Sequence, residues 1–146
     1  MPVVPSLGTD HYFAYQELVD YMRSVEAAVP HLVRLYSIGT SAENRPLVMA
    51  EVTNRGSGEG PEKPALWLDG NLHAAEVAGS MACLEVLYQL ASGHGRDEFI
   101  THLLDTRTFY ILPRLAPDGA EYCLATGNVV QSGIRLDPFE EDRPGL

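Results

Sequence analysis

His73 and Glu76 stand three residues apart in the stretch DGNLHAAEVAGS, residues 69–80. A neutral imidazole and a carboxylate are both good zinc ligands, with donor atoms about 2.0–2.2 Å from the metal. The pair therefore suggests a metal site. The competing interpretation is an incidental histidine before an ordinary acidic residue in the first turn of a helix, where acidic side chains are favoured.

Spacing alone does not decide between these interpretations, because the chain holds two other pairs of the same form. His94 stands three residues before Asp97, and His102 stands three residues before Asp105. Both pairs fall between a long predicted helix and the start of the next predicted strand, which is the wrong end of a sheet for a ligand site. We expect these two histidines to be solvated polar residues.

His73 has a different position in the predicted fold. It follows a short apolar run at 65–69, which predicts a strand, and it precedes an apolar-periodic stretch at 75–91, which predicts a helix. In open α/β sheets, ligands bind outside the carboxyl ends of strands. The N-terminus of the helix also places a positive partial charge beside Glu76, which suits a coordinating carboxylate. The metal site is thus a specific hypothesis, and the incidental interpretation stays open.

Neighbouring residues could complete such a turn. Asp69 or Asn71 could accept the second ring proton of His73 and thereby fix its tautomer. Gly70 permits a tight turn and a close approach of the backbone.

Periodicity along the whole chain predicts an α/β fold with a mixed β-sheet flanked by helices. Two runs rich in β-formers flank the turn-like segment GTSAENR as a hairpin. The apolar run at 65–69 is expected to be buried on both faces. The predicted elements are a helix at 14–28, strands at 32–38, 46–53 and 65–69, helices at 75–91 and 98–104, a strand at 106–113 and a short helix at 117–125.

Composition argues against some classes of partner. The 146 residues carry 10 Lys and Arg against 20 Asp and Glu, a formal net charge of −10. Nucleic acid and anionic membranes require a basic face, so neither is expected as a partner. No apolar run approaches the roughly 18 residues of a spanning helix, and no signal peptide is visible. We expect a cytoplasmic protein, or a secreted one if a signal has been removed. Cys83 and Cys123 are expected to be buried free thiols rather than a disulfide.

Two longer stretches carry a resemblance to a known family. The residues PALWLDGNLHAAEVAGSMA (64–82), followed by RTFYILPRLAPDGAEY (107–122), resemble the zinc carboxypeptidase (metallocarboxypeptidase) family. That family has an HxxE zinc motif after a strand, and then a strand that ends in a Pro-x-x-Asn-Pro-Asp-Gly-like signature. The resemblance covers most of residues 11–126. It implies a carboxypeptidase-like (phosphorylase/hydrolase-like) fold that is incomplete in this chain.

The resemblance also implies roles for single residues. His73 and Glu76 would be the first two of three zinc ligands, and Pro117–Gly119 would shape a wall beside the site. The family's third ligand is a histidine well downstream of the signature, and this chain has no histidine after Gly119. The family's catalytic glutamate also lies further along, so no catalytic residue is expected within residues 1–146.

This sequence departs from the family pattern at two positions. Ala75 stands where members that recognise a free C-terminal carboxylate often have an arginine, and Ala116 replaces the asparagine of the signature. Alanine supplies neither a guanidinium fork nor an amide hydrogen bond, so substrate recognition is open to differ from that of a standard carboxypeptidase. Arg135 loosely matches a substrate-binding arginine of the family that follows the signature, and it is the candidate substrate-binding residue.

The resemblance implies that residues 1–146 are the N-terminal portion of a single catalytic domain. The whole protein would be a zinc-dependent metallopeptidase that hydrolyses peptide bonds, with Zn²⁺ as cofactor and a peptide or small amide as substrate. The chain alone is expected to be inactive. Two alternatives stay open. One is a zinc acylase of the succinylglutamate desuccinylase or aspartoacylase type, and the other is a non-catalytic pseudo-enzyme domain that keeps the fold for binding. The oligomeric state is not determined.

Overall fold

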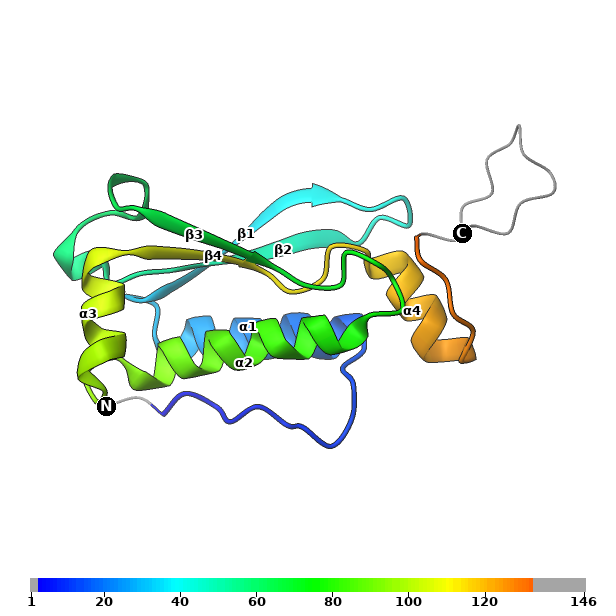
Figure 1. The fold of residues 1–146 in the computed structure, drawn as a ribbon, viewed down its shortest axis with the longest axis horizontal. Coiled ribbons are helices and arrows are strands. Elements are labelled where there is room, and N and C mark those ends of the chain that lie inside the picture. The colour runs from blue at the N-terminus through cyan, green and yellow to red at the C-terminus, as the bar shows by residue number, and fades with distance from the viewer. Residues whose placement is uncertain (1–2, 133–146) are drawn as a thin grey trace.

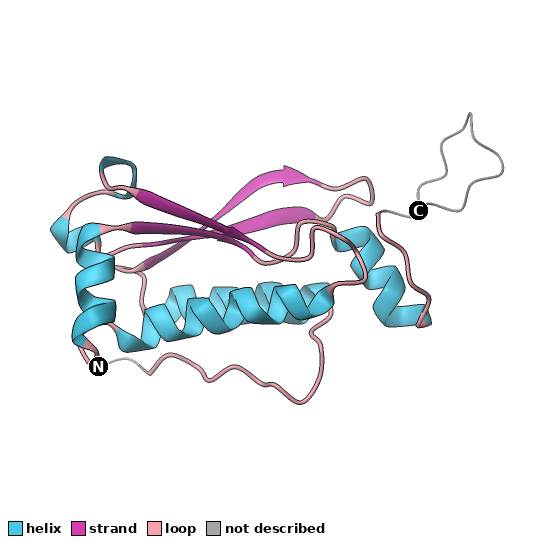
Figure 2. Ribbon diagram, in the orientation of Figure 1, coloured by secondary structure: helices cyan, strands magenta, loops and turns pink. Residues whose placement is uncertain are grey.

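The computed structural model describes residues 3–132, in which helices cover one face of a four-stranded sheet (Figure 1). Figure 2 shows the same arrangement by type of secondary structure. The elements in chain order are α1 (Tyr15–Ala28), β1 (Val33–Thr40), β2 (Pro46–Val52), the short 3-10 helices η1 (Arg55–Ser57) and η2 (Gly60–Glu62), β3 (Ala65–Asp69), α2 (Val77–Gly93), α3 (Glu98–Thr106), β4 (Thr108–Leu112) and α4 (Pro117–Thr126).

The sheet has the strand order β1-β2-β4-β3. β1 pairs with β2, and β2 with β4, in antiparallel directions, whereas β3 and β4 run parallel. The parallel pair brings the carboxyl ends of β3 and β4 to the same end of the sheet, close to α4 (Figure 1). The structure therefore confirms the predicted mixed sheet flanked by helices.

The helices form where apolar residues recur at helical spacing. In α1, Leu18, Met22 and Val25 lie on one stripe, and each is at most 1% exposed. In α2, Leu84 and Leu87 are fully buried in the same core. Burying these stripes against the sheet stabilises each leucine or valine side chain by roughly 1.5–3 kcal/mol relative to exposure. The core thus lies between the sheet and the pair α1 and α2.

β3 is the element whose environment was predicted wrongly. The apolar run was expected to be buried on both faces, but Leu66 is 55% exposed and Trp67 is 51% exposed. Within residues 3–132, β3 hydrogen-bonds to β4 alone, so it is an edge strand rather than a central one. A short apolar run is compatible with either position, because the run itself does not specify how many strands flank it.

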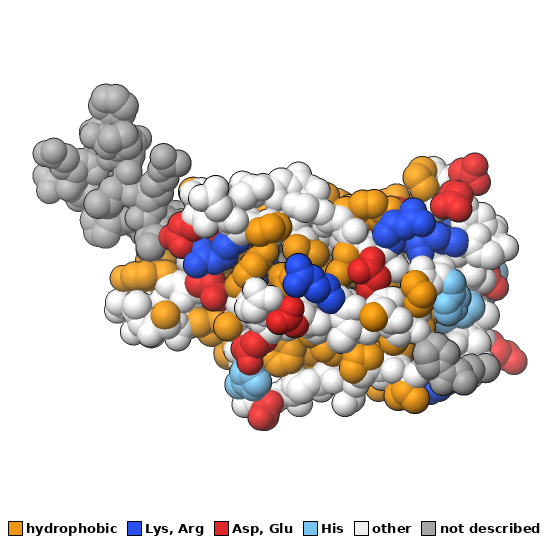
Figure 3. Space-filling model, turned by 180° about the vertical axis from the view of Figure 1, so that it is seen from behind, with side chains coloured by type: hydrophobic (Ala, Val, Ile, Leu, Met, Phe, Trp, Pro, Cys, Tyr) orange, Lys and Arg blue, Asp and Glu red, His pale blue; other side chains and the backbone are white. Residues whose placement is uncertain are grey.

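The cysteines and the helices were also covered by the sequence predictions. Cys83 and Cys123 are both free, as predicted, but only Cys83 is buried and Cys123 is half-buried. Among the helices of residues 3–132, none has the length and apolar character needed to cross a bilayer. On the face in Figure 3, basic and acidic side chains are interspersed between apolar ones. Ion pairs within residues 3–132 include Arg23 with Asp20, and Arg45 with Glu43.

Candidate metal centre

His73 and Glu76 lie on one turn between the end of β3 and the start of α2. Glu76 is the residue that immediately precedes the helix, and its backbone N–H donates to the carbonyl of His73 at 3.0 Å. This turn places the two side chains side by side, with 3.1 Å between His73 Nδ1 and Glu76 Oε1. Both side chains are more than half exposed, so the pair is accessible from solvent.

The geometry of this pair fits a zinc ion. Two donor atoms bound to one tetrahedral zinc at about 2.1 Å lie roughly 3.4 Å apart. The observed 3.1 Å separation between an imidazole nitrogen and a carboxylate oxygen is close to that value. The described part of the chain contains no group of three or more His, Cys, Asp or Glu side chains arranged for a metal. His73 and Glu76 can therefore supply two ligands, and a complete site needs further ones.

A close approach of β3 to α2 holds this turn in place. A Cβ on Gly70 would lie 2.5 Å from the carbonyl oxygen of Gly79 and 2.9 Å from Cys83 Sγ. Only glycine fits there, as the sequence suggested. Burial, followed by the charge of Asp69, raises the pKa of the Cys83 thiol to about 11. That thiol therefore stays protonated at neutral pH and is a poor competitor for metal.

Asn71 shapes the turn in a way that was not predicted. Its backbone adopts a left-handed conformation with φ of 58°, and its side-chain amide donates to the carbonyls of His73 and Ala74 at 3.1 and 2.9 Å. Asp69, the other expected partner of the His73 ring, instead accepts a hydrogen bond from Trp67 Nε1. Both residues thus act on other groups, and the contact recorded for the His73 ring is with Glu76.

The segment Pro117–Gly119 packs beside the turn, where the wall was expected. A Cβ on Gly119 would lie 2.5 Å from that of Ala74, so this contact requires glycine. The Asp118 carboxylate accepts hydrogen bonds from Ser41 Oγ and from the Arg45 guanidinium, each at 2.7 Å. Burial disfavours the charge, but these hydrogen bonds outweigh it and lower the pKa of the Asp118 carboxyl. Asp118 therefore joins α4 to the β1–β2 hairpin.

Arg114 is a second residue near the site whose role was missed. It is 3% exposed, and its guanidinium donates to Ser80 Oγ at 3.1 Å, to Glu121 Oε1 at 3.2 Å and to the carbonyl oxygen of Phe13 at 2.9 Å. Burial, partly offset by Glu121, lowers the pKa of this guanidinium. No sequence signal distinguishes it from a surface arginine after a strand.

The positions that depart from the family pattern lie at the site. Ala75 belongs to the same turn as His73 and Glu76, and its backbone N–H donates to the carbonyl of Val130 at 3.1 Å. Ala116 immediately precedes α4, and its N–H donates to the carbonyl of Asn71. Both therefore serve the turn through their backbone alone. Arg135, the candidate substrate-binding residue, lies outside the described residues.

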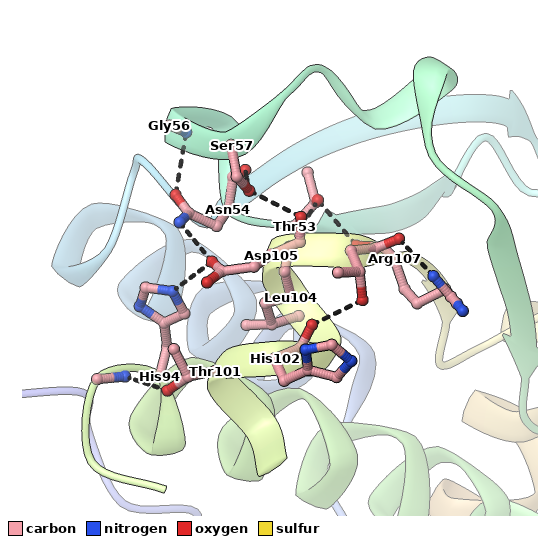
Figure 4. A network of polar contacts seen from close by, with 12 residues as sticks. Thr53, Asn54, Gly56, Ser57, His94, Thr101, His102, Leu104, Asp105 and Arg107 are labelled. Carbon is pink, nitrogen blue, oxygen red and sulfur yellow. Dashed lines mark hydrogen bonds and ion pairs between the residues drawn. The ribbon is translucent and has the colours of Figure 1, made fainter. Parts of the chain in front are cut away.

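α3, which neighbours the other two histidine–acid pairs, lies at the opposite end of the sheet (Figure 1), and Figure 4 shows His94, His102 and Asp105 there. His94 Nε2 is 3.4 Å from Asp105 Oδ1, which also accepts from the Asn54 side chain at 2.7 Å. The His94 side chain is only 18% exposed, so the expectation that it is solvated was wrong. His102 is exposed, as expected. Asp97 caps α3 through the N–H of Ile100.

A sequence profile of the zinc carboxypeptidase family matches residues 18–135, which include both the turn that carries His73 and Glu76 and the LAPDG segment. The chain belongs to the zinc carboxypeptidase family. Among zinc carboxypeptidases, one from Saccharothrix mutabilis subsp. capreolus is 33% identical over 121 residues. Carboxypeptidase A2 of Rattus norvegicus is 33% identical over 118 residues. These matches cover 83% and 81% of this chain but 28% and 27% of the two relatives, so the chain spans little more than a quarter of their length.

Solved structures share the fold. Thrombin-activatable fibrinolysis inhibitor (TAFI) superposes with a TM-score of 0.82 at 25% identity, covering 92% of this chain and 33% of that one. Carboxypeptidase A from Helicoverpa armigera superposes with a TM-score of 0.76 at 20% identity, covering 89% of this chain and 30% of that one. The expected carboxypeptidase-like fold is confirmed, and this chain corresponds to about a third of it.

Proposed function

We propose that this chain is the N-terminal portion of the catalytic domain of a zinc-dependent, carboxypeptidase-type metallopeptidase. In this proposal His73 and Glu76 are two of the zinc ligands. The supporting observation is the 3.1 Å approach of an imidazole nitrogen and a carboxylate oxygen at the carboxyl end of β3, in a chain that belongs to a zinc carboxypeptidase family. The substrate is a peptide or another small amide.

In this proposal the described residues have separate roles in binding the metal and in shaping the site. His73 and Glu76 would hold the ion at the solvent-exposed turn, where a substrate can reach it. The N-terminal N–H groups of α2 complement the negative charge of Glu76. Pro117–Gly119 would limit one side of the site. Zinc, when bound, supplies a Lewis acid that polarises the scissile carbonyl group.

The identity of residue 75 is also compatible with a second candidate function. Ala75 provides no guanidinium for a substrate carboxylate, although it lies on the same turn as both proposed ligands. This suits a zinc acylase acting on small N-acyl amino acids, or a binding domain without hydrolytic activity, as well as a peptidase that reads its substrate through other residues. Membership of the zinc carboxypeptidase family favours the peptidase.

Hydrolysis assays on the longest natural chain that contains this sequence distinguish these candidates. The proposal predicts zinc-dependent release of C-terminal residues from peptides, with activity abolished by His73→Ala and by Glu76→Gln. His102→Ala, which removes an exposed histidine at the other end of the sheet, is the matched control and is expected to leave activity unchanged. Activity on N-acyl amino acids but not on peptides would identify an acylase. Activity that persists in His73→Ala would contradict the proposed ligand.

A further inference from the structure

The three residues that follow Pro113 form hydrogen bonds near both ends of the turn between β3 and α2, which carries His73 and Glu76. At its start, the backbone N–H of Leu115 donates to the carbonyl of Gly70, and that of Ala116 donates to the carbonyl of Asn71, each at 3.1 Å. These two bonds fix the chain at the point where β3 ends. Near the other end of the turn, where α2 begins, the backbone N–H of Ala75 donates to the carbonyl of Val130, and a side chain from residue 114 adds a further contact.

Arg114 provides the side-chain contact with the start of α2. Its Nε donates to Ser80 Oγ at 3.1 Å, and both residues are buried, at 3% and 0% exposure. Ser80 is the fourth residue of α2 and so belongs to the first turn of the helix, which Glu76 immediately precedes. The consecutive residues 114–116 thus bind both ends of the stretch that carries His73 and Glu76.

We propose that Arg114 is a positioning residue for the metal pair. This inference rests on the proposed function, in which His73 and Glu76 share a zinc ion. By fixing the first turn of α2 against the end of β3, Arg114 sets where the Glu76 carboxylate stands relative to the His73 ring. Its own side chain is almost fully buried, so it does not contact a substrate and acts only through α2.

The shape of the guanidinium explains why an arginine suits this place. Its remaining donors reach two other segments, Glu121 Oε1 on α4 at 3.2 Å and the carbonyl oxygen of Phe13 at 2.9 Å. Glu121 Oε1 also accepts from the backbone N–H of Tyr15 at the start of α1, at 2.8 Å. A rigid, planar fork can direct hydrogen bonds to three separate segments at once, whereas a lysine ammonium is a single point on a flexible stem. Arg114 therefore links α2 by hydrogen bonds to α4 and to the segment just before α1.

Two variants separate positioning from general stabilisation. Arg114→Lys keeps a positive charge beside Glu121 but loses the fork, and Ser80→Ala removes only the bond to α2. Val25→Ala is the matched control, because it truncates a fully buried core residue in α1 and takes part in none of the hydrogen bonds described for residues 114–116. All three are expected to lower the melting temperature of the apoprotein.

The deciding measurement is a Zn²⁺ titration followed at the NMR resonances of the His73 ring, assigned by their loss in His73→Ala. Removal of groups that orient metal ligands typically weakens metal binding by 10–100-fold, and we expect Ser80→Ala and Arg114→Lys to raise the Kd at His73 by roughly tenfold. Val25→Ala should leave that Kd within about twofold of wild type at a temperature where it is folded.

Two results would overturn the inference, and they have different meanings. If Ser80→Ala and Arg114→Lys lower the melting temperature but leave the Kd at the wild-type value, Arg114 is a structural residue only and the proposed function is unaffected. If Zn²⁺ does not perturb the His73 ring in the wild-type protein, the proposed function itself is contradicted and the positioning role falls with it.

Discussion

Gly70, directly after β3, is in close contact with Gly79 in the first turn of α2. A Cβ on Gly70 would lie 2.5 Å from the Gly79 carbonyl oxygen. Gly70→Ala should therefore force the strand end away from the helix, at a cost of about 1–3 kcal/mol typical of overpacking. Urea denaturation measures this loss. Gly39→Ala is the control, because its new Cβ would meet only Leu47 at an ordinary 3.6 Å. Equal stabilities of the two variants would show that the close approach is not required.

Asn71 tests how the turn itself is held. Asn71→Gly keeps the left-handed backbone but loses the two hydrogen bonds to the carbonyls of His73 and Ala74. Asn71→Ala loses the same bonds and adds steric strain of about 1–2 kcal/mol at a positive φ. We expect both variants to be less stable than wild type in thermal unfolding, and the alanine variant to have the lower melting temperature of the two. The reverse order would contradict the observed conformation.

Asp118 should make stability depend on pH at the acid end. Its hydrogen bonds from Ser41, Arg45 and the backbone N–H of Glu43 lower the folded-state pKa below the ordinary 3.8. A depressed pKa contributes stability that is present above pH 3.8 and is lost as pH falls through the lower folded value. Asp118→Asn should thus cost about 1.5–3 kcal/mol at pH 7, as expected for hydrogen bonds to a charged group, and progressively less below pH 4.

Denaturation of wild type and Asp118→Asn at pH 7 and pH 3 tests this directly. Asp20→Asn, which removes an exposed carboxylate that pairs with Arg23 on α1, serves as the control and should change stability by less than about 1 kcal/mol at either pH. A difference between wild type and Asp118→Asn that does not shrink on acidification would argue against the ionised, hydrogen-bonded carboxylate.

The two free thiols should differ sharply in reactivity. Cys83 is 3% exposed and has a pKa of about 11, so only about a thousandth of it is thiolate at pH 8. Cys123 is half-buried. A thiol reagent such as DTNB should label Cys123 first in the native protein and reach Cys83 only as the protein unfolds. Rapid labelling of both thiols would show that the packing of α2 under Gly70 is wrong. Cys123→Ser isolates the slow reaction.

The success of the sequence predictions depended on how local the signal was. The stripe of Leu18, Met22 and Val25 is a repeat within one helix, so α1 was predicted closely. The exposure of Trp67 was missed, because it depends on which strands flank β3 and not on the strand's own residues.

The same distinction holds at the site. The placement of His73 and Glu76 on one turn followed from a strand end and a helix start nearby in the sequence. The partners of Asn71 were not predictable, because they depend on its left-handed backbone. The burial of Arg114 is set by segments as distant as Phe13, about a hundred residues away, which no local pattern indicates.

Whether His73 and Glu76 bind one zinc ion can be seen in an anomalous difference map recorded at the zinc absorption edge. Crystals grown with Zn²⁺ should show a peak about 2.0–2.2 Å from both His73 Nδ1 and Glu76 Oε1, the distances expected for zinc ligands. A zinc peak at other residues with none at this turn, or an intact hydrogen bond between the two side chains in saturating zinc, would show that His73 and Glu76 do not share a zinc ion.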